Sequence, residues 1–286
     1  MIAPSLDAKL ERMRAILREL KSVAVAFSAG ADSTFVLKVA VDTLGARNVV
    51  AVTGRSDSLA GAEFEDACAL ARFVGVEHVV IDTGEFDDEN YLANPVNRCY
   101  FCKTALYDRM AEFITRRGLG AVVSGTNVDD QGDFRPGLRA ADEHRVRSPA
   151  AEAGLTKTEI RALSERFGLP THDKPASPCL SSRIPYGEPV TSAKLRMIEA
   201  AEIYLHDLGF RECRVRHHAG DAARIEVPRD RIGELDEPLR SGRLAEQFLA
   251  MGYETVTIDP KGFRSGSLNE AIGQDGVKVR VQLRVS

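Results

Sequence analysis

The sequence lacks the features that mark membrane and secreted proteins. None of its apolar runs approaches the ~20 consecutive residues that a membrane-spanning helix needs, and its first residues show no basic segment followed by an apolar core. Five cysteines in 286 residues are too few, and odd in number, for a disulfide scaffold. We therefore expect no membrane partner and a cytoplasmic location, where cysteines serve as metal ligands or reactive thiols.

The sequence also lacks an excess of positive charge. Lysine and arginine total 38 against 42 aspartates and glutamates, so the formal net charge is −4. Proteins that hold a long RNA or DNA backbone usually carry a basic excess, which disfavours nucleic acid as a partner. With 44% hydrophobic and 28% charged residues, the composition suits a globular protein of about two domains.

Hydrophobic periodicity predicts an α/β fold for the N-terminal part of the chain. Apolar runs rich in β-branched residues alternate with segments whose apolar residues recur at helical spacing. Strands are expected at 22–27, 49–53, 76–82 and 120–124, and helices at 6–20, 33–44, 60–74 and 102–117. This order favours a parallel sheet covered on both faces, with ligands at the carboxyl ends of its strands.

A second, smaller domain is expected after residues 184–189, where two prolines and a glycine interrupt regular structure. The pattern there predicts helices at 191–208 and 241–251 and strands at 214–216, 223–227 and 255–258. We therefore assign residues 1–185 to the parallel α/β domain and residues 186–286 to an α+β C-terminal domain.

The loop at 27–33 (Phe-Ser-Ala-Gly-Ala-Asp-Ser) joins the first predicted strand to a helix. Gly30 lets the backbone approach an anion, Ser28 and Ser33 supply hydroxyls, and the helix start attracts negative charge. Ser33 is also expected to cap the helix. The loop lacks the Gly-Lys-Ser/Thr of a Walker loop and the three glycines of a dinucleotide fingerprint. Asp32 suits a Mg²⁺ ion held against phosphates; a plain strand–helix turn is the alternative.

A second polar loop follows the fourth predicted strand. Its Gly125, Thr126 and Asn127 are small hydrogen-bonding residues at the same expected edge of the sheet. We expect these residues to line the same crevice, with an ordinary turn rich in Asn and Asp as the alternative.

Three cysteines lie in polar segments. Cys99 and Cys102 form a C-x-x-C that we expect just before a helix, where neighbouring cations favour the thiolates. Zinc would need two more ligands, an iron–sulfur cluster often has four thiolates, and a redox pair or structural cysteines are further alternatives. Cys179 stands between a proline and a Ser-Ser-Arg stretch, where Arg183 is placed to lower the pKa of the thiol or to hold a phosphate.

The predicted C-terminal domain offers further charged candidates. Arg183, Arg214 and Arg216 suit bidentate binding of a phosphate or carboxylate, and strand alternation puts the last two on one face. Glu202 and Glu226 suit a divalent ion or proton transfer. The alternative for all of these residues is that they lie on a solvent-exposed face and bind no ligand.

These segments together resemble a known family. The loop at 28–33 is similar to the phosphate loop of PP-loop ATP pyrophosphatases, of the adenine nucleotide alpha hydrolase-like fold, although Ala29 replaces the usual glycine and needs a negative φ to be tolerated. The match to the LarE family of ATP-dependent sulfur transferases runs nearly end to end. Its motifs lie at 98–103, 125–127, 178–187, 214–216 and 262–269.

The resemblance implies an enzyme that adenylylates a carboxylate of pyridinium-3,5-biscarboxylic acid mononucleotide, releases pyrophosphate and makes a thiocarboxylate for a nickel-pincer nucleotide cofactor. ATP and Mg²⁺ would bind the two polar loops. Sulfur would come from Cys179, leaving dehydroalanine, or from a sulfide on a [4Fe–4S] cluster held by Cys99, Cys102 and Cys179; the filled C-x-x-C favours the cluster. The resemblance also implies a homo-oligomer, with a hexamer as one candidate state.

Three other functions stay open. A tRNA thiolase can also combine a PP-loop with a three-cysteine cluster, although the acidic charge argues against it. An amide-forming synthetase using ammonia would have structural cysteines, and a non-catalytic nucleotide sensor would carry zinc on the C-x-x-C.

Overall fold

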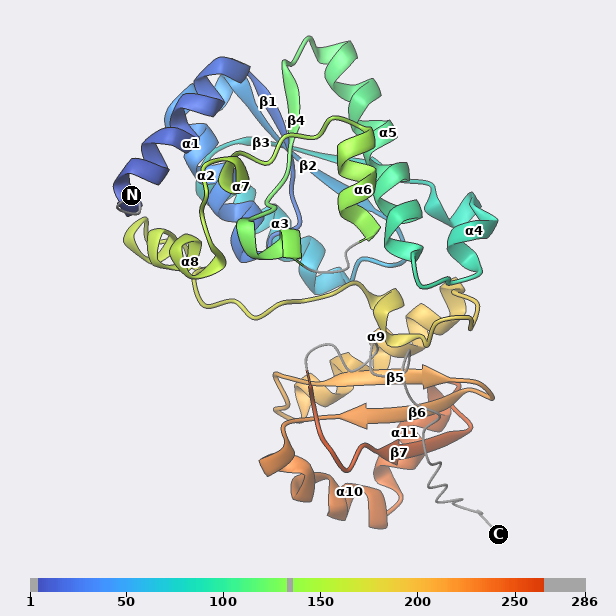
Figure 1. The fold of residues 1–286 in the computed structure, drawn as a ribbon. Helices are drawn as coiled ribbons and strands as arrows, with labels where there is room; N and C mark the ends of the chain where they lie inside the picture. Colours follow the sequence, from blue (N-terminus) through green and yellow to red (C-terminus); the bar gives the residue numbers. More distant parts are fainter. Residues whose placement is uncertain (1–4, 133–135, 265–286) are drawn as a thin grey trace. The chain divides into compact units, whose positions relative to one another are not determined.

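The computed structural model describes residues 5–132 and 136–264 (Figure 1). The chain divides into two compact units, one of Met1–Tyr91 with Asn97–Ser177 and the other of Leu92–Val96 with Pro178–Ser286. Asn94 ties the short segment to the second unit, because its side-chain amide donates to the carbonyls of Pro185 and Glu188 at 2.8 and 2.9 Å. The domain limit at 185 stays a prediction, and residues 265–269 of the C-terminal motif lie outside the described residues.

The first unit is built on a four-stranded parallel sheet of order β3-β2-β1-β4. Its strands are β1 (Val23–Ala26), β2 (Val49–Arg55), β3 (Glu77–Asp82) and β4 (Ala121–Val123). Val23 of the central strand pairs with Val49 on one side and Ala121 on the other. The predicted α/β class with a parallel sheet is therefore confirmed.

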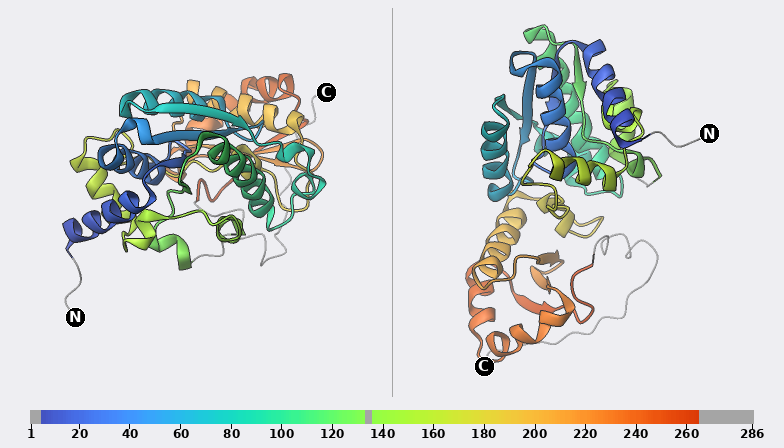
Figure 2. Two further views of the ribbon diagram at one scale, coloured as in Figure 1. Left: turned by 90° about the horizontal axis from the view of Figure 1, so that it is seen from above. Right: turned by 90° about the vertical axis from the view of Figure 1, so that its left-hand side faces the viewer.

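Helices cover both faces of this sheet (Figures 1 and 2). The helices of the unit are α1 (Leu6–Leu20), α2 (Ala31–Leu44), α3 (Gly61–Val74), α4 (Glu89–Leu92, which runs into the second unit), α5 (Arg98–Arg117), α6 (Pro136–Glu143), α7 (Pro149–Glu152) and α8 (Lys157–Arg166). Alternate residues of a strand point to opposite faces, so Val23 and Val25 pack with α1, α2, α3 and α8, whereas Ala24 packs with α5 and α6. All four strands thus end at one edge, which the loops of the site occupy.

The second unit has a three-stranded sheet of order β5-β6-β7, in which β5 and β6 are antiparallel and β6 and β7 parallel. Its elements are α9 (Ser192–Asp207), β5 (Arg214–His218), β6 (Ala222–Glu226), α10 (Asp236–Arg240), α11 (Arg243–Ala250) and β7 (Thr255–Ile258). Val215 and Ile225 pack on one face against Leu205 of α9 and Phe248 of α11. The alternate strand residues, among them Arg214, Arg216, Arg224 and Glu226, are left for the other face.

One helix prediction differs from the structure. The C-x-x-C does not precede a helix: α5 begins at Arg98, so Cys99 and Cys102 lie in its first turns. The helix expected at 241–251 is confirmed as α11, and Gly242, with a positive φ of 79°, separates it from α10, which was not predicted. A local glycine of this kind readily ends a helix.

Across residues 5–132 and 136–264, every helix is too short or too polar to traverse a bilayer.

Candidate functional site

Three hydrogen bonds shape the loop between β1 and α2. The backbone N–H of Ser28 donates to the hydroxyl of Ser33 at 3.3 Å, the two serine hydroxyls lie 3.2 Å apart, and the Ser33 hydroxyl donates to the Gly30 carbonyl at 3.3 Å. Gly30, with φ −77° and ψ 165°, is the N-cap of α2. The expected capping role of Ser33 was therefore wrong: its side chain folds back and ties the loop to the first helical turn.

Ala29 has an unfavourable backbone conformation. Its φ is +57°, in the left-handed region, and its side chain is completely buried. The condition under which alanine is tolerated here without strain, a negative φ, is therefore not met. A Cβ atom in the left-handed region costs about 1–2 kcal/mol, which the surrounding packing has to offset.

Asp32, the second residue of α2, keeps one carboxylate oxygen available. Its Oδ1 atom is buried and has no hydrogen-bond partner, although the helix start favours a negative charge there. Burial raises the pKa of Asp32, Lys157 and Arg161 oppose that shift, and Asp130 adds to it. Mg²⁺ fits these residues, because it is commonly bound by one or two carboxylates together with phosphate oxygens.

The second polar loop packs directly against the first. A Cβ atom on Gly125 would lie 2.7 Å from the backbone nitrogen of Ser33, so only glycine allows this approach. The hydroxyls of Ser124 and Thr126 are 3.0 Å apart, and the fully buried Asn127 has a side-chain nitrogen without a partner. The predicted neighbourhood of the two loops is present in the structure, and the nucleotide-binding roles of their residues stay predictions.

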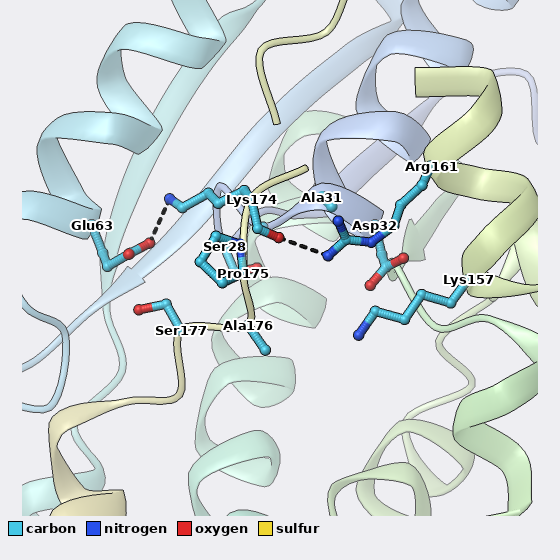
Figure 3. A pocket seen from close by; sticks show the side chains of 11 residues that line it. Ser28, Ala31, Asp32, Glu63, Lys157, Arg161, Lys174, Pro175, Ala176 and Ser177 are labelled. Atoms are coloured by element: carbon cyan, nitrogen blue, oxygen red, sulfur yellow. Dashed lines mark hydrogen bonds and ion pairs between the residues drawn. The ribbon is translucent and has the colours of Figure 1, made fainter. Parts of the chain in front are cut away.

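A pocket of about 150 Å³ opens on the phosphate loop (Figure 3). It is lined by residues 28 and 30–32, by Glu63 of α3, by Lys157 and Arg161 of α8, and by residues 174–177. None of the three cations of this lining was among the candidates from the sequence. One signal was available for Lys157, because it follows Thr156 in a Thr-x-x-Glu pattern that marks the start of a helix, where a lysine opposes the helix dipole.

Residues 172–177 are attached to the wall of the pocket. The Arg161 guanidinium donates to the carbonyls of His172 at 3.0 Å and Lys174 at 2.8 Å. The Lys174 ammonium lies 2.9 Å from Glu63 and 2.7 Å from Asp66. Ser177 lines the pocket, and Cys179 follows two residues later in the chain.

The cysteines differ in their surroundings. Cys99 and Cys102 are three residues apart on α5, a spacing that places side chains on one helix face. Cys99 and Cys179 are exposed, and Cys179 is the N-cap of a 3₁₀ helix at Leu180–Arg183. Burial raises the pKa of Cys213 to about 12, which keeps this thiol protonated.

The thiolate donors of Cys99, Cys102 and Cys179 have the chemistry that an iron–sulfur cluster requires, with two of them in the first unit and one in the second. Within the described ranges, no group of three or more His, Cys, Asp or Glu side chains is arranged to hold a metal ion.

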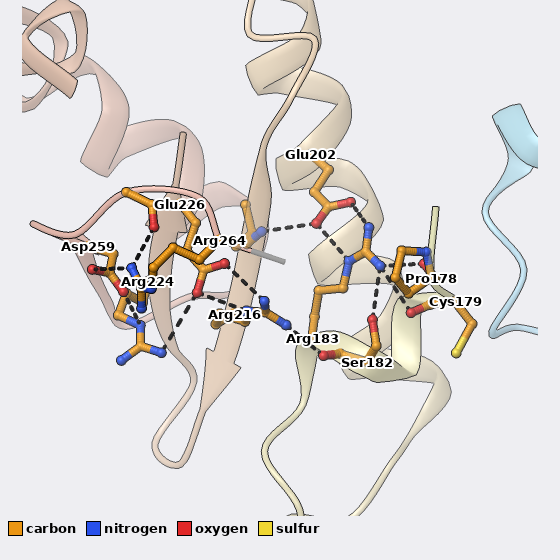
Figure 4. Close-up of polar contacts among 12 residues, drawn as sticks. Pro178, Cys179, Ser182, Arg183, Glu202, Arg216, Arg224, Glu226, Asp259 and Arg264 are labelled. Atoms are coloured by element: carbon orange, nitrogen blue, oxygen red, sulfur yellow. Dashed lines mark hydrogen bonds and ion pairs between the residues drawn. The ribbon is translucent and has the colours of Figure 1, made fainter. Parts of the chain in front are cut away.

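Two bidentate ion pairs dominate the second unit (Figure 4). Arg183 donates from Nε and Nη2 to Glu202, both at 2.9 Å, and Arg216 donates to Glu226 at 3.0 and 2.9 Å. Arg183 also donates to the Cys179 carbonyl at 3.1 Å, and Arg216 to the Ser182 carbonyl at 2.7 Å. Both arginines thus hold the turn that carries the Cys179 thiol. The metal-binding roles of Glu202 and Glu226 stay predictions.

One cluster of side chains in this unit holds more positive than negative charge. Arg214 lies over the Phe263 ring at 5.0 Å, and burial, with Arg183 and Arg216, lowers its pKa to about 10. Arg224 and Arg264 lie 3.6 and 3.7 Å from Asp259. Five arginines therefore face three carboxylates: Arg183, Arg214, Arg216, Arg224 and Arg264 against Glu202, Glu226 and Asp259. Such an arrangement attracts anions.

No family model matches the chain, but comparison with known proteins finds relatives. An uncharacterized protein of Synechocystis sp. is 45% identical over 93% of this chain and 99% of its own. The pyridinium-3,5-bisthiocarboxylic acid mononucleotide synthase of Lactiplantibacillus plantarum is 39% identical over 94% and 96%. A tRNA-specific 2-thiouridylase of Xanthobacter autotrophicus is 28% identical over 54% and 49%, and belongs to the PP-loop superfamily.

Proposed function

The chain belongs to the LarE family, and from this we propose that it uses ATP to convert a carboxylate of pyridinium-3,5-biscarboxylic acid mononucleotide into a thiocarboxylate. The single observation that carries the proposal is the lining of the pocket. The phosphate loop forms one part of it, and Ser177, two residues before the exposed Cys179 thiol, forms another. Two peptide units span at most about 7 Å, so the chain tethers a sulfur nucleophile to the nucleotide pocket.

The first step would activate the carboxylate. A carboxylate oxygen attacks the α-phosphorus of ATP, pyrophosphate leaves, and an acyl adenylate forms. The hydroxyls of Ser28 and Ser33, with the N–H groups at the start of α2, are placed to bind phosphate oxygens. Asp32 would hold Mg²⁺, which supplies positive charge against the phosphates when bound.

The second step would deliver sulfur. In the sacrificial route, the Cys179 thiolate attacks the acyl carbon and AMP leaves, which gives a thioester. Loss of the Cys179 α-proton and cleavage of the Cβ–S bond then leave dehydroalanine in the protein and sulfur on the product. Arg183 donates a hydrogen bond to the Cys179 carbonyl and so holds the backbone that carries this thiol.

The filled C-x-x-C favours a second sulfur source. Cys99, Cys102 and Cys179 would hold a [4Fe–4S] cluster, which supplies a sulfide when bound. Under this route the protein is not consumed, and all three thiolates are required. The sacrificial route requires only the thiolate of Cys179.

The arginine-rich face of the second unit is suited to the substrate. Arg214, Arg216 and the neighbouring arginines would bind the phosphate and carboxylate groups of the pyridinium mononucleotide, because guanidinium groups bind both bidentately. Arg183 and Arg216 already pair with glutamates, so the substrate would add to existing ion pairs. A homo-oligomeric state stays a prediction.

The proposal is tested with protein purified under anaerobic conditions and incubated with ATP, Mg²⁺ and the substrate. We expect pyrophosphate, AMP and a thiocarboxylate product. Iron and sulfide analysis, with intact-protein mass, then separates the sulfur sources: bound iron with unchanged protein mass supports the cluster, and iron-free protein that loses one H₂S per turnover supports sacrifice.

Matched variants sharpen this test. Cys99→Ala and Cys102→Ala abolish product formation under the cluster route and leave it under the sacrificial route, while Cys68→Ala on α3 is the control. Absence of substrate-dependent pyrophosphate release would refute an adenylylating enzyme. Tight, salt-sensitive binding of tRNA with thiolation would identify a tRNA thiolase instead.

A further inference from the structure

We infer that Thr53 of β2 and His78 of β3 are positioning residues that hold the phosphate loop in its conformation. Both side chains lie outside the lining of the pocket, so their effect on a bound nucleotide would pass through the loop. This inference rests on the proposed function, because it takes residues 27–33 as the binding site for the phosphates of ATP. It supplies a cause for the conformation that presents the hydroxyls of Ser28 and Ser33.

The two side chains interrupt an apolar row on one face of the sheet. Val49, Ala51 and Thr53 are alternate residues of β2, so their side chains share a face, and the first two belong to the core beneath α2 and α3. His78 pairs in register with Ala51 and therefore lies on the same face of the neighbouring strand. Thr53 is buried. Because a buried hydroxyl is unfavourable unless it is hydrogen-bonded, its partners indicate its role.

The Thr53 hydroxyl connects His78 to the first residue of the loop. Its Oγ1 atom donates to the Phe27 carbonyl at 2.8 Å and lies 2.8 Å from Nε2 of His78. A hydroxyl has one hydrogen, and the carbonyl takes it, so the hydroxyl accepts from His78. The His78 ring is thereby assigned the tautomer with hydrogen on Nε2. Burial lowers the pKa of His78 and keeps the ring neutral.

The Phe27–Ser28 peptide is fixed at both ends. Its carbonyl accepts from Thr53, and its N–H donates to the Ser33 hydroxyl at 3.3 Å. A peptide unit is planar, so these two hydrogen bonds set the orientation of the whole unit. The backbone then turns into the left-handed region at Ala29. Loss of the Thr53 bond would free this peptide to rotate and would disturb the turn that places the serine hydroxyls.

Equilibrium binding to the full chain tests the role of Thr53. The probes are α,β-methylene-ATP with Mg²⁺ and inorganic pyrophosphate. Thr53→Val removes the hydroxyl and keeps the shape of the side chain, whereas Thr53→Ser keeps the hydroxyl. A neutral hydrogen bond corresponds to about 3- to 10-fold in affinity. We expect Thr53→Val to weaken the binding of both probes by that factor, and Thr53→Ser to stay within about 2-fold of the unmodified protein.

Substitution of His78 tests whether it acts through Thr53. His78→Leu removes the donor, and His78→Gln retains an N–H at the same number of bonds from the backbone. We expect His78→Leu to weaken the binding of both probes by about 3-fold and His78→Gln to restore it. The double variant of Thr53→Val with His78→Leu should bind as weakly as Thr53→Val alone, because no hydroxyl is left to orient. Additive losses would overturn the inference.

The His78 tautomer provides a second readout that needs no substitution of Thr53. Long-range proton–nitrogen NMR spectra of the unmodified protein, labelled with ¹⁵N-histidine, distinguish the two ring nitrogens, and His78→Gln identifies the signals of this ring. We expect hydrogen on Nε2. Hydrogen on Nδ1 would overturn the inference, and this measurement decides it even if Thr53→Val does not fold.

Thr43→Val is the matched control for the loss of a hydroxyl. The Thr43 hydroxyl also donates to a backbone carbonyl, that of Val39, near the other end of α2. We expect its affinity for both probes to be unchanged, and circular dichroism establishes that each variant is folded. Unchanged affinity of Thr53→Val, or an equal loss in Thr43→Val, would overturn the inference while leaving the proposed function intact. Failure of the unmodified protein to bind the ATP analogue would overturn both.

Discussion

The two units hold the side chains of their candidate sites in different ways. Around the phosphate loop of the first unit, Asp32 Oδ1 and the side-chain nitrogen of Asn127 are buried without a hydrogen bond of ordinary geometry, although Asn127 lies close enough to lower the pKa of Asp32. In the second unit, Arg183 and Arg216 are each held by a glutamate through two hydrogen bonds. A buried polar group without a partner costs free energy that a ligand can recover.

This difference suggests separate roles for the two units. We expect the polar atoms of the first unit to bind a ligand, while Arg183 and Arg216 of the second unit hold the turn that carries Cys179. The first site is therefore expected to gain stability from a ligand, and the second to depend on its internal pairs. Four substitutions test this contrast.

Cys179→Ala gives the largest expected effect on activity, because it removes the proposed sulfur-carrying residue of the second unit and leaves the phosphate loop of the first unit intact. Thiocarboxylate formation should fall below detection, since no other exposed thiol follows the pocket-lining segment. Pyrophosphate release in a single turnover should persist, because the phosphate loop is unchanged. Quench-flow measurement of both products, with Cys68→Ala as control, checks this. Product formation at the original rate by the alanine variant would exclude Cys179 from both sulfur routes.

Glu226→Gln tests the internal pairs of the second unit. Glu226 is completely buried, and removal of one partner from a buried ion pair typically costs about 3–5 kcal/mol. We expect a loss of that size in the free energy of unfolding, measured by urea titration with circular dichroism.

The exposed pair of Glu237 with Arg243 provides the comparison. Glu237→Gln should cost below about 1 kcal/mol, and replacement of both Arg216 and Glu226 by methionine should recover part of the larger loss. Equal effects of the two single substitutions would contradict the contrast between buried and exposed pairs.

Asp32→Asn should reduce activity and raise stability together. Loss of the charge proposed to hold Mg²⁺ should slow pyrophosphate release by about 100-fold, the effect of removing one preorganised electrostatic contact. Burial raises the folded-state pKa of Asp32, so ionisation costs stability above that pKa, and the cost disappears as the pH falls through it. The asparagine variant should therefore unfold at a higher temperature at pH 7 without nucleotide.

The pH dependence provides an independent check on Asp32. The stability advantage of Asp32→Asn should shrink as the pH is lowered toward the unfolded-state pKa of aspartate, about 3.9. A lower melting temperature than the unmodified protein at pH 7 would show that the Asp32 charge is stabilised in the folded state.

Ala29→Gly has the smallest expected effect. Glycine removes the steric cost of a Cβ atom at φ +57°, but it also gives the unfolded chain more conformational freedom, which offsets part of the gain. We therefore expect the free energy of unfolding to rise by about 0.5–1 kcal/mol. Ala31→Gly, at the start of α2 with helical geometry, should instead lose about 0.5–1 kcal/mol. Melting temperatures that change in the same direction for both variants would mean that backbone strain at Ala29 is relieved elsewhere.

The sequence by itself determined the parallel α/β class, most element positions and the two polar loops. These follow from signals that act over a few residues: apolar periodicity, and glycine and serine between a strand and a helix. The resemblance to a sulfur transferase family rested on the same short motifs, such as residues 98–103 and 178–187, and the comparisons confirmed it.

Tertiary structure alone decided which distant side chains meet. Lys157 and Arg161 reach the phosphate loop only because α8 packs on the same face of the sheet as α2, and Arg183 finds Glu202 only because α9 lies beside its turn. The φ of Ala29 was likewise decided by packing against residues remote in the chain. Such pairings depend on the burial and register of whole elements, and short stretches of sequence carry no signal for them.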